Sequence, residues 1–195
     1  MEIKSILPNI FTIFRLVASF VIVLVYITFG KFAFEIILPL YILGGISDYF
    51  DGKLARKYNV ITTFGKCFDI IADKTLVLVT LLIGMNEGSV HIFFAFIILF
   101  REFAVSGMRE VLAEDRIKIP ASKLGKWKTG FQMTACGFAV GQYASWATGL
   151  LMLIPPLSWV AVYVQEITFI LLLISSVLTV LSGFNYTKGI FHKKS

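Results

Sequence analysis

The chain has 195 residues, 57% of them hydrophobic and only 15% charged, with a formal net charge of +6 and a mean hydropathy of +0.84. Soluble domains are usually about half apolar and about a quarter charged, so this composition excludes a soluble globular protein. It predicts an all-α polytopic membrane protein that forms one transmembrane domain over residues 1–195, with no separate soluble domain.

The apolar sequence divides into six segments that approach the roughly 20 residues a helix needs to cross a bilayer. In chain order the predicted spans are 11–29, 32–56, 65–84, 91–112, 129–151 and a sixth that starts near 158 or 167 and ends at 184. A short amphipathic segment, 1–9, precedes the first span, and we expect a break in it at Pro8. No small-residue cleavage site follows the first span, so we expect it to be retained rather than removed as a signal peptide.

The segments between the predicted spans carry most of the positive charge. We expect a turn at 85–89, a basic connection at 113–128 that contains Pro120, and a break at Pro155 and Pro156. Six spans place both termini, the 56–66 turn and the 113–128 connection on one side, and only Lys31 among the 18 lysines and arginines belongs to the other. The positive-inside rule therefore predicts a multi-pass protein with both termini in the cytoplasm.

Aspartate is concentrated in one stretch of this apolar chain, because four of its five aspartates lie between residues 48 and 73. On a helix, Asp48 and Asp51 are spaced i, i+3, and Asp69 and Asp73 are spaced i, i+4, so each pair lies on one helical face. Four converging carboxylates repel one another where water is scarce, unless a cation neutralises them. Magnesium and manganese prefer such all-oxygen sites. The spacing therefore predicts a metal site at the cytoplasmic edge of the membrane.

The residues beside the aspartates allow a phosphate ligand to approach. Gly52, Ala55 and Gly65 are small, and the guanidinium of Arg56 can bind a phosphate with two parallel hydrogen bonds. Two metal ions could clamp the attacking and leaving oxygens of a phosphoryl displacement. Taken singly, the small residues are as well explained by tight helix packing; together with the four aspartates, they favour a ligand site.

The complete pattern, D-x2-D-G-x2-A-R-x8-G-x3-D-x3-D over residues 48–73, resembles the signature of the CDP-alcohol phosphotransferases. These are integral membrane enzymes of phospholipid synthesis. The resemblance implies six transmembrane helices, usually a homodimer, and a cytoplasmic site for two divalent cations, Mg²⁺ or Mn²⁺, and a CDP-linked lipid. It implies no nucleic-acid partner.

The resemblance also implies a role for each residue of the motif. Asp48, Asp51, Asp69 and Asp73 correspond to metal ligands, and Asp73 to the general base that deprotonates the acceptor hydroxyl. The donor, CDP-diacylglycerol, is expected to contact Asp48, Asp51, Gly52, Ala55, Arg56, Thr62 and Asp69. The two histidines independently favour an aspartate base, because His91 is predicted on the far side and His192 lies in the tail.

Residues outside the motif resemble the bacterial phosphatidylglycerophosphate synthases of that family. The matching positions are Pro8 and Asn9 with Thr12 and Arg15, then Arg101 and Glu102, Ser106 and Arg109, and the stretch 122–129. The resemblance implies a bacterial inner-membrane enzyme that transfers the phosphatidyl group to glycerol 3-phosphate, giving phosphatidylglycerol phosphate and CMP. The acceptor phosphate needs cations of its own, and the candidates are Arg101, Arg109, Lys123, Lys126 and Lys128.

Several alternatives stay open at this point. Arg101 could instead form an ion pair with Glu102, and the lysines could serve only as topology signals. The acceptor could be inositol phosphate, serine or phosphatidylglycerol. A cation transporter is a distant alternative, since it would place acidic residues near the bilayer midplane. Cys67 and Cys136 are far apart and form no CxxC motif, so we expect them to be packing residues.

Overall fold

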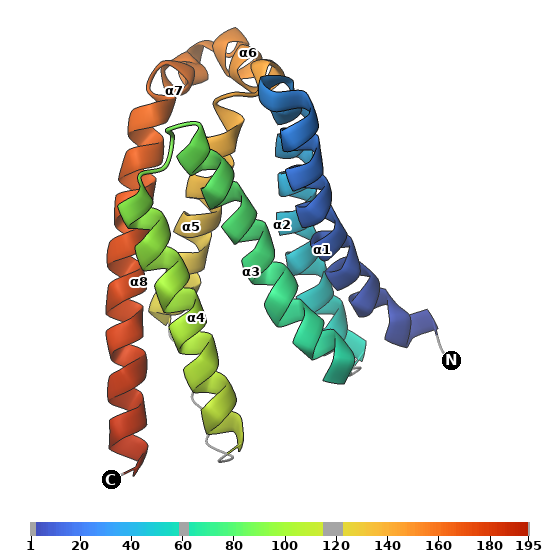
Figure 1. Cartoon of the computed structure of the whole chain (residues 1–195), viewed down its shortest axis with the longest axis vertical. Coiled ribbons are helices and arrows are strands. Elements are labelled where there is room, and N and C mark those ends of the chain that lie inside the picture. The colour runs from blue at the N-terminus through green and yellow to red at the C-terminus, as the bar shows by residue number, and fades with distance from the viewer. Residues whose placement is uncertain (1–2, 59–62, 115–122, 195) are drawn as a thin grey trace. The chain divides into compact units, whose positions relative to one another are not determined.

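The computed structural model describes residues 3–58, 63–114 and 123–194, and every regular element within them is helical (Figure 1). In chain order the elements are α1 (Ile3–Phe29), η1 (Gly30–Ala33), α2 (Phe34–Tyr58), α3 (Thr63–Asn86), α4 (Ile92–Glu114), α5 (Lys123–Gly141), α6 (Ser145–Leu153), η2 (Pro155–Leu157), α7 (Ser158–Val162) and α8 (Val164–Lys194). The predicted all-α class is confirmed.

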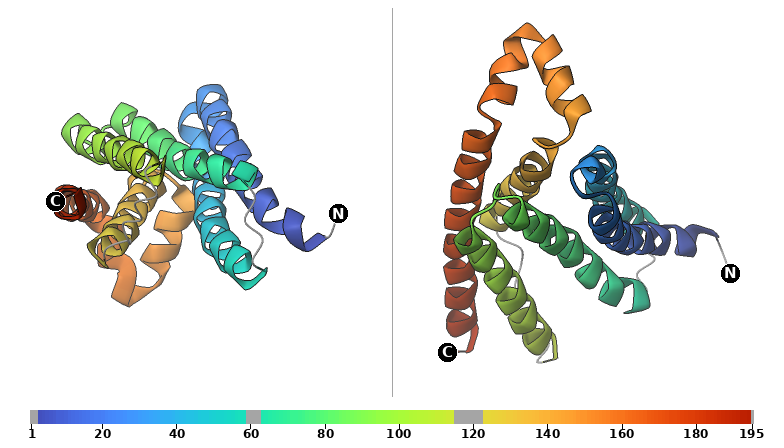
Figure 2. Two further views of the ribbon diagram at one scale, coloured as in Figure 1. Left: turned by 90° about the horizontal axis from the view of Figure 1, so that it is seen from below. Right: turned by 45° about the horizontal axis from the view of Figure 1, so that its top comes forward.

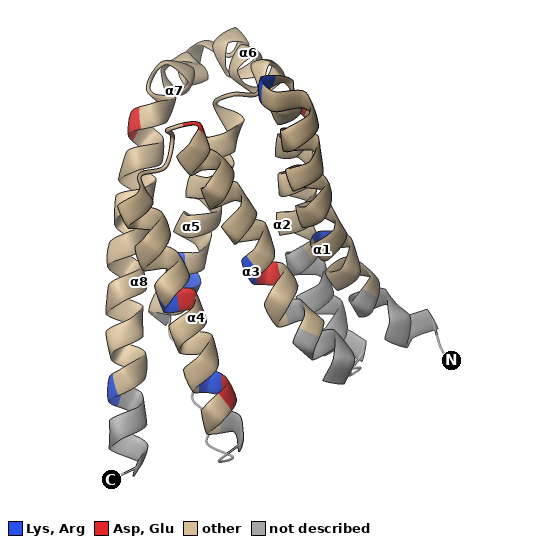
Figure 3. Ribbon diagram, in the orientation of Figure 1, with Lys and Arg blue, Asp and Glu red and all other residues tan. Residues whose placement is uncertain are grey.

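Two helical stretches among the described residues are long and apolar enough to cross a bilayer, Ile10–Ser47 and Val164–Lys188. A third candidate is the pair Ser145–Leu153 and Pro155–Val162, which is bent by 119°. Between Glu166 and Lys188 α8 carries no charged residue (Figure 3). These features are those of a membrane protein.

The chain divides into two compact units, each built from stretches distant in sequence. The first comprises Met1–Ile83 and Val140–Val162, and the second comprises Gly84–Ala139 and Tyr163–Ser195.

In the first unit, α1 and α2 pack side by side along their lengths (Figures 1 and 2). Gly30 begins the turn between them with φ +54°, a conformation that glycine adopts without steric cost. Phe34 is fully buried, and its ring lies 6.0 Å from that of Tyr26 and 4.8 Å from that of Tyr143. Aromatic packing therefore joins α1, α2 and the segment after α5.

A carboxylate from α2 caps the start of α6 in the same unit. Ala144, the residue before α6, supplies no side-chain cap. Instead Glu35 Oε1 accepts hydrogen bonds from the backbone N–H and the hydroxyl of Ser145, at 2.9 and 2.6 Å. The carboxylate satisfies a helix N–H that would otherwise lack a partner within the helix.

We expect Glu35→Ala to lower the midpoint of thermal unfolding in detergent, because the α6 N-terminus loses both hydrogen bonds. Ser145→Ala is the matched control, and it should lower the midpoint less, because the backbone N–H still reaches the carboxylate. Equal midpoints for Glu35→Ala and the unmodified protein would show that this cap is unimportant.

In the second unit, α4 packs against α8, and the rings of Phe94 and Phe169 meet edge to face at 5.4 Å. The α3–α4 turn contains Gly88 at φ +80°, which confirms a turn here, although it starts after Asn86 rather than at the predicted 85. The Ser89 hydroxyl donates to the Ala139 carbonyl of α5 at 3.0 Å.

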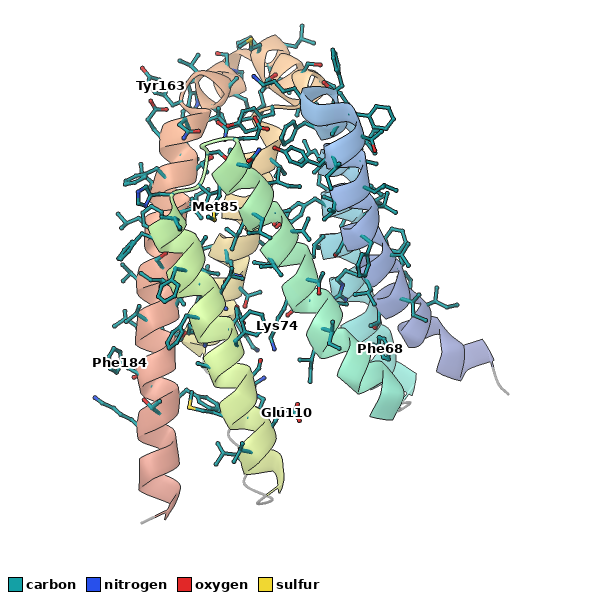
Figure 4. All side chains as sticks on the ribbon, viewed as in Figure 1. Phe68, Lys74, Met85, Glu110, Tyr163 and Phe184 are labelled. Atoms are coloured by element: carbon teal, nitrogen blue, oxygen red, sulfur yellow. The ribbon has the colours of Figure 1, made fainter. Side chains whose placement is uncertain are left out.

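The buried and exposed faces of α8 differ in polarity. Among its described side chains, the buried positions are Thr168, Leu172, Ser175, Ser176, Thr179 and Ser182, so five of these six carry a hydroxyl. Most of its exposed positions are apolar, including Phe184, which points outward (Figure 4), and the exposed polar residues Gln165, Glu166, Asn185 and Lys188 lie towards the two ends of the helix. A helix that faces lipid outside and makes polar contacts inside has this arrangement.

Four boundaries differ from those predicted. First, α1 runs unbroken through Pro8, so the break expected there is wrong; in the second helical turn, a proline removes a single hydrogen bond close to a helix end. Second, Lys123–Lys128 of the predicted connection already belong to α5.

The other two differences concern the last third of the chain. The predicted fifth span is interrupted, because α5 ends at Gly141 and Ala144 is extended before α6 begins. The break at Pro155 and Pro156 is confirmed by η2. The last helix starts at Val164, and it ends at Lys194 rather than at the predicted residue 184. The basic tail continues the helix because lysine is a good helix former.

Candidate functional site

The aspartate motif occupies two consecutive helices, as predicted. Asp48 and Asp51 lie in α2, and Asp69 and Asp73 lie in α3. Gly52, Ala55 and Arg56 also belong to α2, and Gly65 belongs to α3, whereas Thr62 lies outside the described residues. Both aspartate pairs therefore lie on observed helices, and the i, i+3 and i, i+4 spacings put the two positions of each pair on the same face.

Asp73 is the member of this motif whose side chain the structure describes. No group of three or more His, Cys, Asp or Glu that could hold a metal is found among the described side chains, which do not include those of Asp48, Asp51 and Asp69. The donor set itself fits a hard divalent cation, because four carboxylates provide only oxygen ligands.

Asp73 contacts a buried cation from α1. Its side chain is 53% exposed, and its Oδ1 lies 3.9 Å from Nη1 of Arg15, whose side chain is 1% exposed. The position of Asp73 on α3 can be found in Figure 4 from the label of Lys74, the next residue. The sequence indicated Arg15 only through its resemblance to the phosphatidylglycerophosphate synthases, and the structure places it against the predicted base.

A second polar cluster joins α4, α5 and α8 within the second unit. Nη2 of Arg101 donates to the Ser182 hydroxyl at 2.9 Å, and Nη1 lies 3.9 Å from Oε2 of Glu102. The ammonium of Lys128 forms an ion pair with Oε1 of Glu102. The alternative of an Arg101–Glu102 ion pair is thus confirmed, although Lys128 is the closer partner of this carboxylate.

Lys128 is a structural cation in this arrangement. Its side chain is 2% exposed, and the charge on its ammonium is balanced by Glu102. A solvent-facing topology signal would be exposed, so that alternative does not describe Lys128. It stays open for Lys126, which is exposed two residues earlier in α5.

The remaining predicted cations lie apart from this ion pair. Arg109 is exposed, and its guanidinium carbon lies 5.9 Å from the centre of the Tyr186 ring, a cation–π contact between α4 and α8. Lys123 begins α5, and its side chain is outside the described set. Arg101 is therefore the strongest candidate for an acceptor-phosphate ligand.

Several buried polar atoms on α4, α5 and α8 of the second unit lack a hydrogen-bond partner among the described residues. They are Arg101 Nε, Gln132 Oε1, Ser175 Oγ, Ser176 Oγ and Thr179 Oγ1. Buried polar atoms are normally satisfied, so these positions favour contact with a polar ligand or water. The sequence analysis missed the α8 hydroxyls, although Ser and Thr recur there at helical spacing.

His91 precedes α4 directly. Its Nδ1 accepts the backbone N–H of Phe93 at 3.2 Å at the start of α4, so the ring serves as a local cap. The side chain of His192 lies outside the described set. Cys136 is buried and forms no disulfide with another described residue, as expected of a packing residue.

We expect Glu102→Ala to destabilise the protein by about 3–5 kcal/mol, because it leaves the buried Lys128 ammonium without its carboxylate. The midpoint of thermal unfolding in detergent measures this loss. The double substitution Glu102→Gln with Lys128→Met should recover most of it, since no buried charge remains.

The matched control is Glu110→Gln, which removes an exposed carboxylate from the same helix (Figure 4). It should leave the midpoint unchanged. A double variant no more stable than Glu102→Ala would contradict the ion-pair explanation.

The chain is similar in sequence to known proteins. A family model described as CDP-alcohol phosphatidyltransferase matches residues 5–181. Proteins named CDP-diacylglycerol–glycerol-3-phosphate 3-phosphatidyltransferase are 36% identical in Rickettsia felis and 37% identical in Rickettsia prowazekii, each over 97% of this chain and 97% of the relative. The protein of that name from Haemophilus influenzae is 32% identical over 92% of this chain and 90% of its own length.

Proposed function

The chain belongs to the CDP-alcohol phosphatidyltransferase family, and on that basis we propose that it transfers the phosphatidyl group from CDP-diacylglycerol to glycerol 3-phosphate, giving phosphatidylglycerol phosphate and CMP. The observation that carries this proposal is the agreement over nearly the full length with relatives named for that reaction. The complete aspartate motif on α2 and α3 also supports it.

The proposed chemistry takes place at the aspartates of α2 and α3. When bound by Asp48, Asp51, Asp69 and Asp73, two divalent cations such as Mg²⁺ or Mn²⁺ would neutralise negative charge on the diphosphate and on the reacting oxygens. Asp73 takes the proton from the acceptor hydroxyl, whose oxygen attacks the lipid-side phosphorus of the donor. The bond from that phosphorus to CMP breaks, and CMP leaves. The partial exposure of Asp73 is consistent with access by a water-soluble acceptor.

The donor is proposed to lie along the same two helices. Gly52 and Ala55 leave room for the nucleotide beside α2, and the Arg56 guanidinium binds a phosphate oxygen of the CDP group. Thr62 is proposed to contribute a further diphosphate contact. The acyl chains of donor and product stay in the bilayer throughout.

The acceptor phosphate is proposed to bind Arg101, with Arg109, Lys123 and Lys126 providing positive charge towards the cytoplasm. Ser182 holds one end of the Arg101 guanidinium, and the buried Nε has no partner among the described residues. Lys128 acts indirectly, because it holds Glu102 beside Arg101.

We expect Arg101→Ala to raise the KM for glycerol 3-phosphate about tenfold or more and to change the KM for CDP-diacylglycerol by less than about threefold. Steady-state CMP release, with one substrate varied at a time, measures both constants. Lys188→Gln is the matched control, since it removes an exposed cation from α8. A selective rise in the donor KM would instead assign Arg101 to the donor site.

The proposed setting is the bacterial inner membrane, with six transmembrane helices, a cytoplasmic active site and cytoplasmic termini. Six helices of 19 residues or more are present among the described residues and would serve as these spans. A homodimer is proposed from the family resemblance alone.

The test of the proposed function is CMP formation by the purified protein in detergent with CDP-diacylglycerol. Glycerol 3-phosphate should support CMP release, whereas inositol phosphate, serine and phosphatidylglycerol should not. Preference for another of these acceptors would keep the chemistry and change the substrate. No CMP release with any of them would reject the enzyme and favour the cation-transporter alternative.

A further inference from the structure

Arg15 is a fully buried charged side chain. It lies on the buried face of α1 together with Thr12, Ala18, Ser19 and Ile22, and it is the largest fully buried side chain among the described residues. Removing a guanidinium from water costs several kcal/mol, whereas an apolar side chain of similar volume would fill the space without that cost. The presence of arginine at this position therefore calls for an explanation other than packing.

The first unit makes room for this side chain at Gly44 of α2. A Cβ at position 44 would lie 2.9 Å from Cδ2 of Leu76 and 3.8 Å from Cγ of Arg15. Any larger residue would press on Leu76 and touch the stem of Arg15. Side chains from α1 and α3 thus meet at a glycine of α2, and the aliphatic part of Arg15 is enclosed at this point.

The buried guanidinium of Arg15 lies beside the carboxylate of Asp73. The two groups form an unequal pair, since Arg15 is 1% exposed and Asp73 is 53% exposed. A half-exposed carboxylate gains little stability from an ion pair, so stabilisation of the fold explains this contact poorly. The buried guanidinium is also poorly accessible to a substrate phosphate.

We infer that Arg15 is a positioning residue that fixes the direction in which the Asp73 carboxylate points into the active site. This inference rests on the proposed function, in which Asp73 is the base. The stem of Arg15 passes Gly44, and its guanidinium is buried, so it presents a cation at a fixed place on α1. Nη1 and Oδ1 are 3.9 Å apart, which is too far for a hydrogen bond, so Arg15 acts on the carboxylate through its charge. This attraction favours the rotamers of Asp73 that bring Oδ1 towards α1, and correct alignment of a catalytic group is worth up to about a hundredfold in rate.

The test compares Arg15→Gln and Arg15→Lys in the purified protein. Arg15→Gln should lower kcat about ten- to a hundredfold while both KM values change less than about threefold. Arg15→Lys keeps the charge without the planar fork and should retain an intermediate kcat. Lys188→Gln again controls for loss of one cation and should leave kcat unchanged.

Mn²⁺ binding without substrates, followed by electron paramagnetic resonance, gives a readout that does not depend on turnover. Loss of a cation next to a carboxylate favours binding of another cation, so Arg15→Gln should bind Mn²⁺ as tightly as the unmodified protein or up to about tenfold more tightly. In an Asp73→Asn background the same substitution should shift Mn²⁺ affinity less, because the carboxylate that Arg15 contacts is gone.

Each other outcome overturns the inference in a recognisable way. An unchanged kcat removes the positioning role, and a tenfold rise in one KM makes Arg15 a substrate ligand. Weaker Mn²⁺ binding together with a lower unfolding midpoint in both variants makes it a structural residue. If the unmodified protein releases no CMP with glycerol 3-phosphate, the proposed function fails, and the Mn²⁺ comparison still decides whether Arg15 acts on Asp73.

Discussion

Asp73→Asn should leave a folded protein whose CMP release from CDP-diacylglycerol and glycerol 3-phosphate falls by about a thousandfold or more. A positioned general base contributes about 10²–10⁴ in rate, and the substitution also removes one negative charge from the proposed metal site. The carboxamide has almost the shape of the carboxylate, and the side chain is half exposed. The fold should therefore tolerate the change, which the unfolding midpoint in detergent verifies.

Asp115→Asn provides the matched control, because Asp115 is the one aspartate outside the motif. The control should retain CMP release close to that of the unmodified protein. Substantial turnover by Asp73→Asn would contradict its role as the base, and an equal loss in Asp115→Asn would show that the effect is not specific to the motif.

Removal of divalent cations by EDTA should abolish CMP release, and excess Mg²⁺ or Mn²⁺ should restore it. In the proposed site, the four carboxylates of the consecutive helices α2 and α3 would repel one another without a cation, so the unfolding midpoint should also rise when either ion is added. EDTA already saturated with Mg²⁺ is the control and should have no effect. Full activity after exhaustive chelation would reject the metal-dependent mechanism.

The helices could be predicted from the sequence because long apolar runs in this chain have no alternative to helical structure in a membrane. The breaks were harder to predict. Gly141–Ala144 contains no proline and lies between two apolar segments, and hydropathy measures composition rather than the direction of the backbone. The predicted start of α5 is too late, because lysines are typical of a connection on the cytoplasmic side and are also good helix formers.

The two parts of the candidate site also differ in how well they can be predicted from the sequence. The aspartate motif could be predicted because its spacings are local and its two helices are consecutive. The surroundings of Arg101 could not, because its partner Ser182 is 81 residues away, and Glu102 and Lys128 are 26 residues apart. Which cation is neutralised and which remains for a ligand depends on these distant contacts.

The sharp bend after α6 has a consequence for how often the chain changes sides of the bilayer. Helix α6 has 9 residues, which at about 1.5 Å per residue span about 14 Å. This length is about half of the roughly 30 Å hydrocarbon layer, and after the 119° bend α7 adds only 5 residues. Neither helix is long enough to cross this layer by itself, so in the proposed topology of six spans the bent pair adds no crossing between α5 and α8.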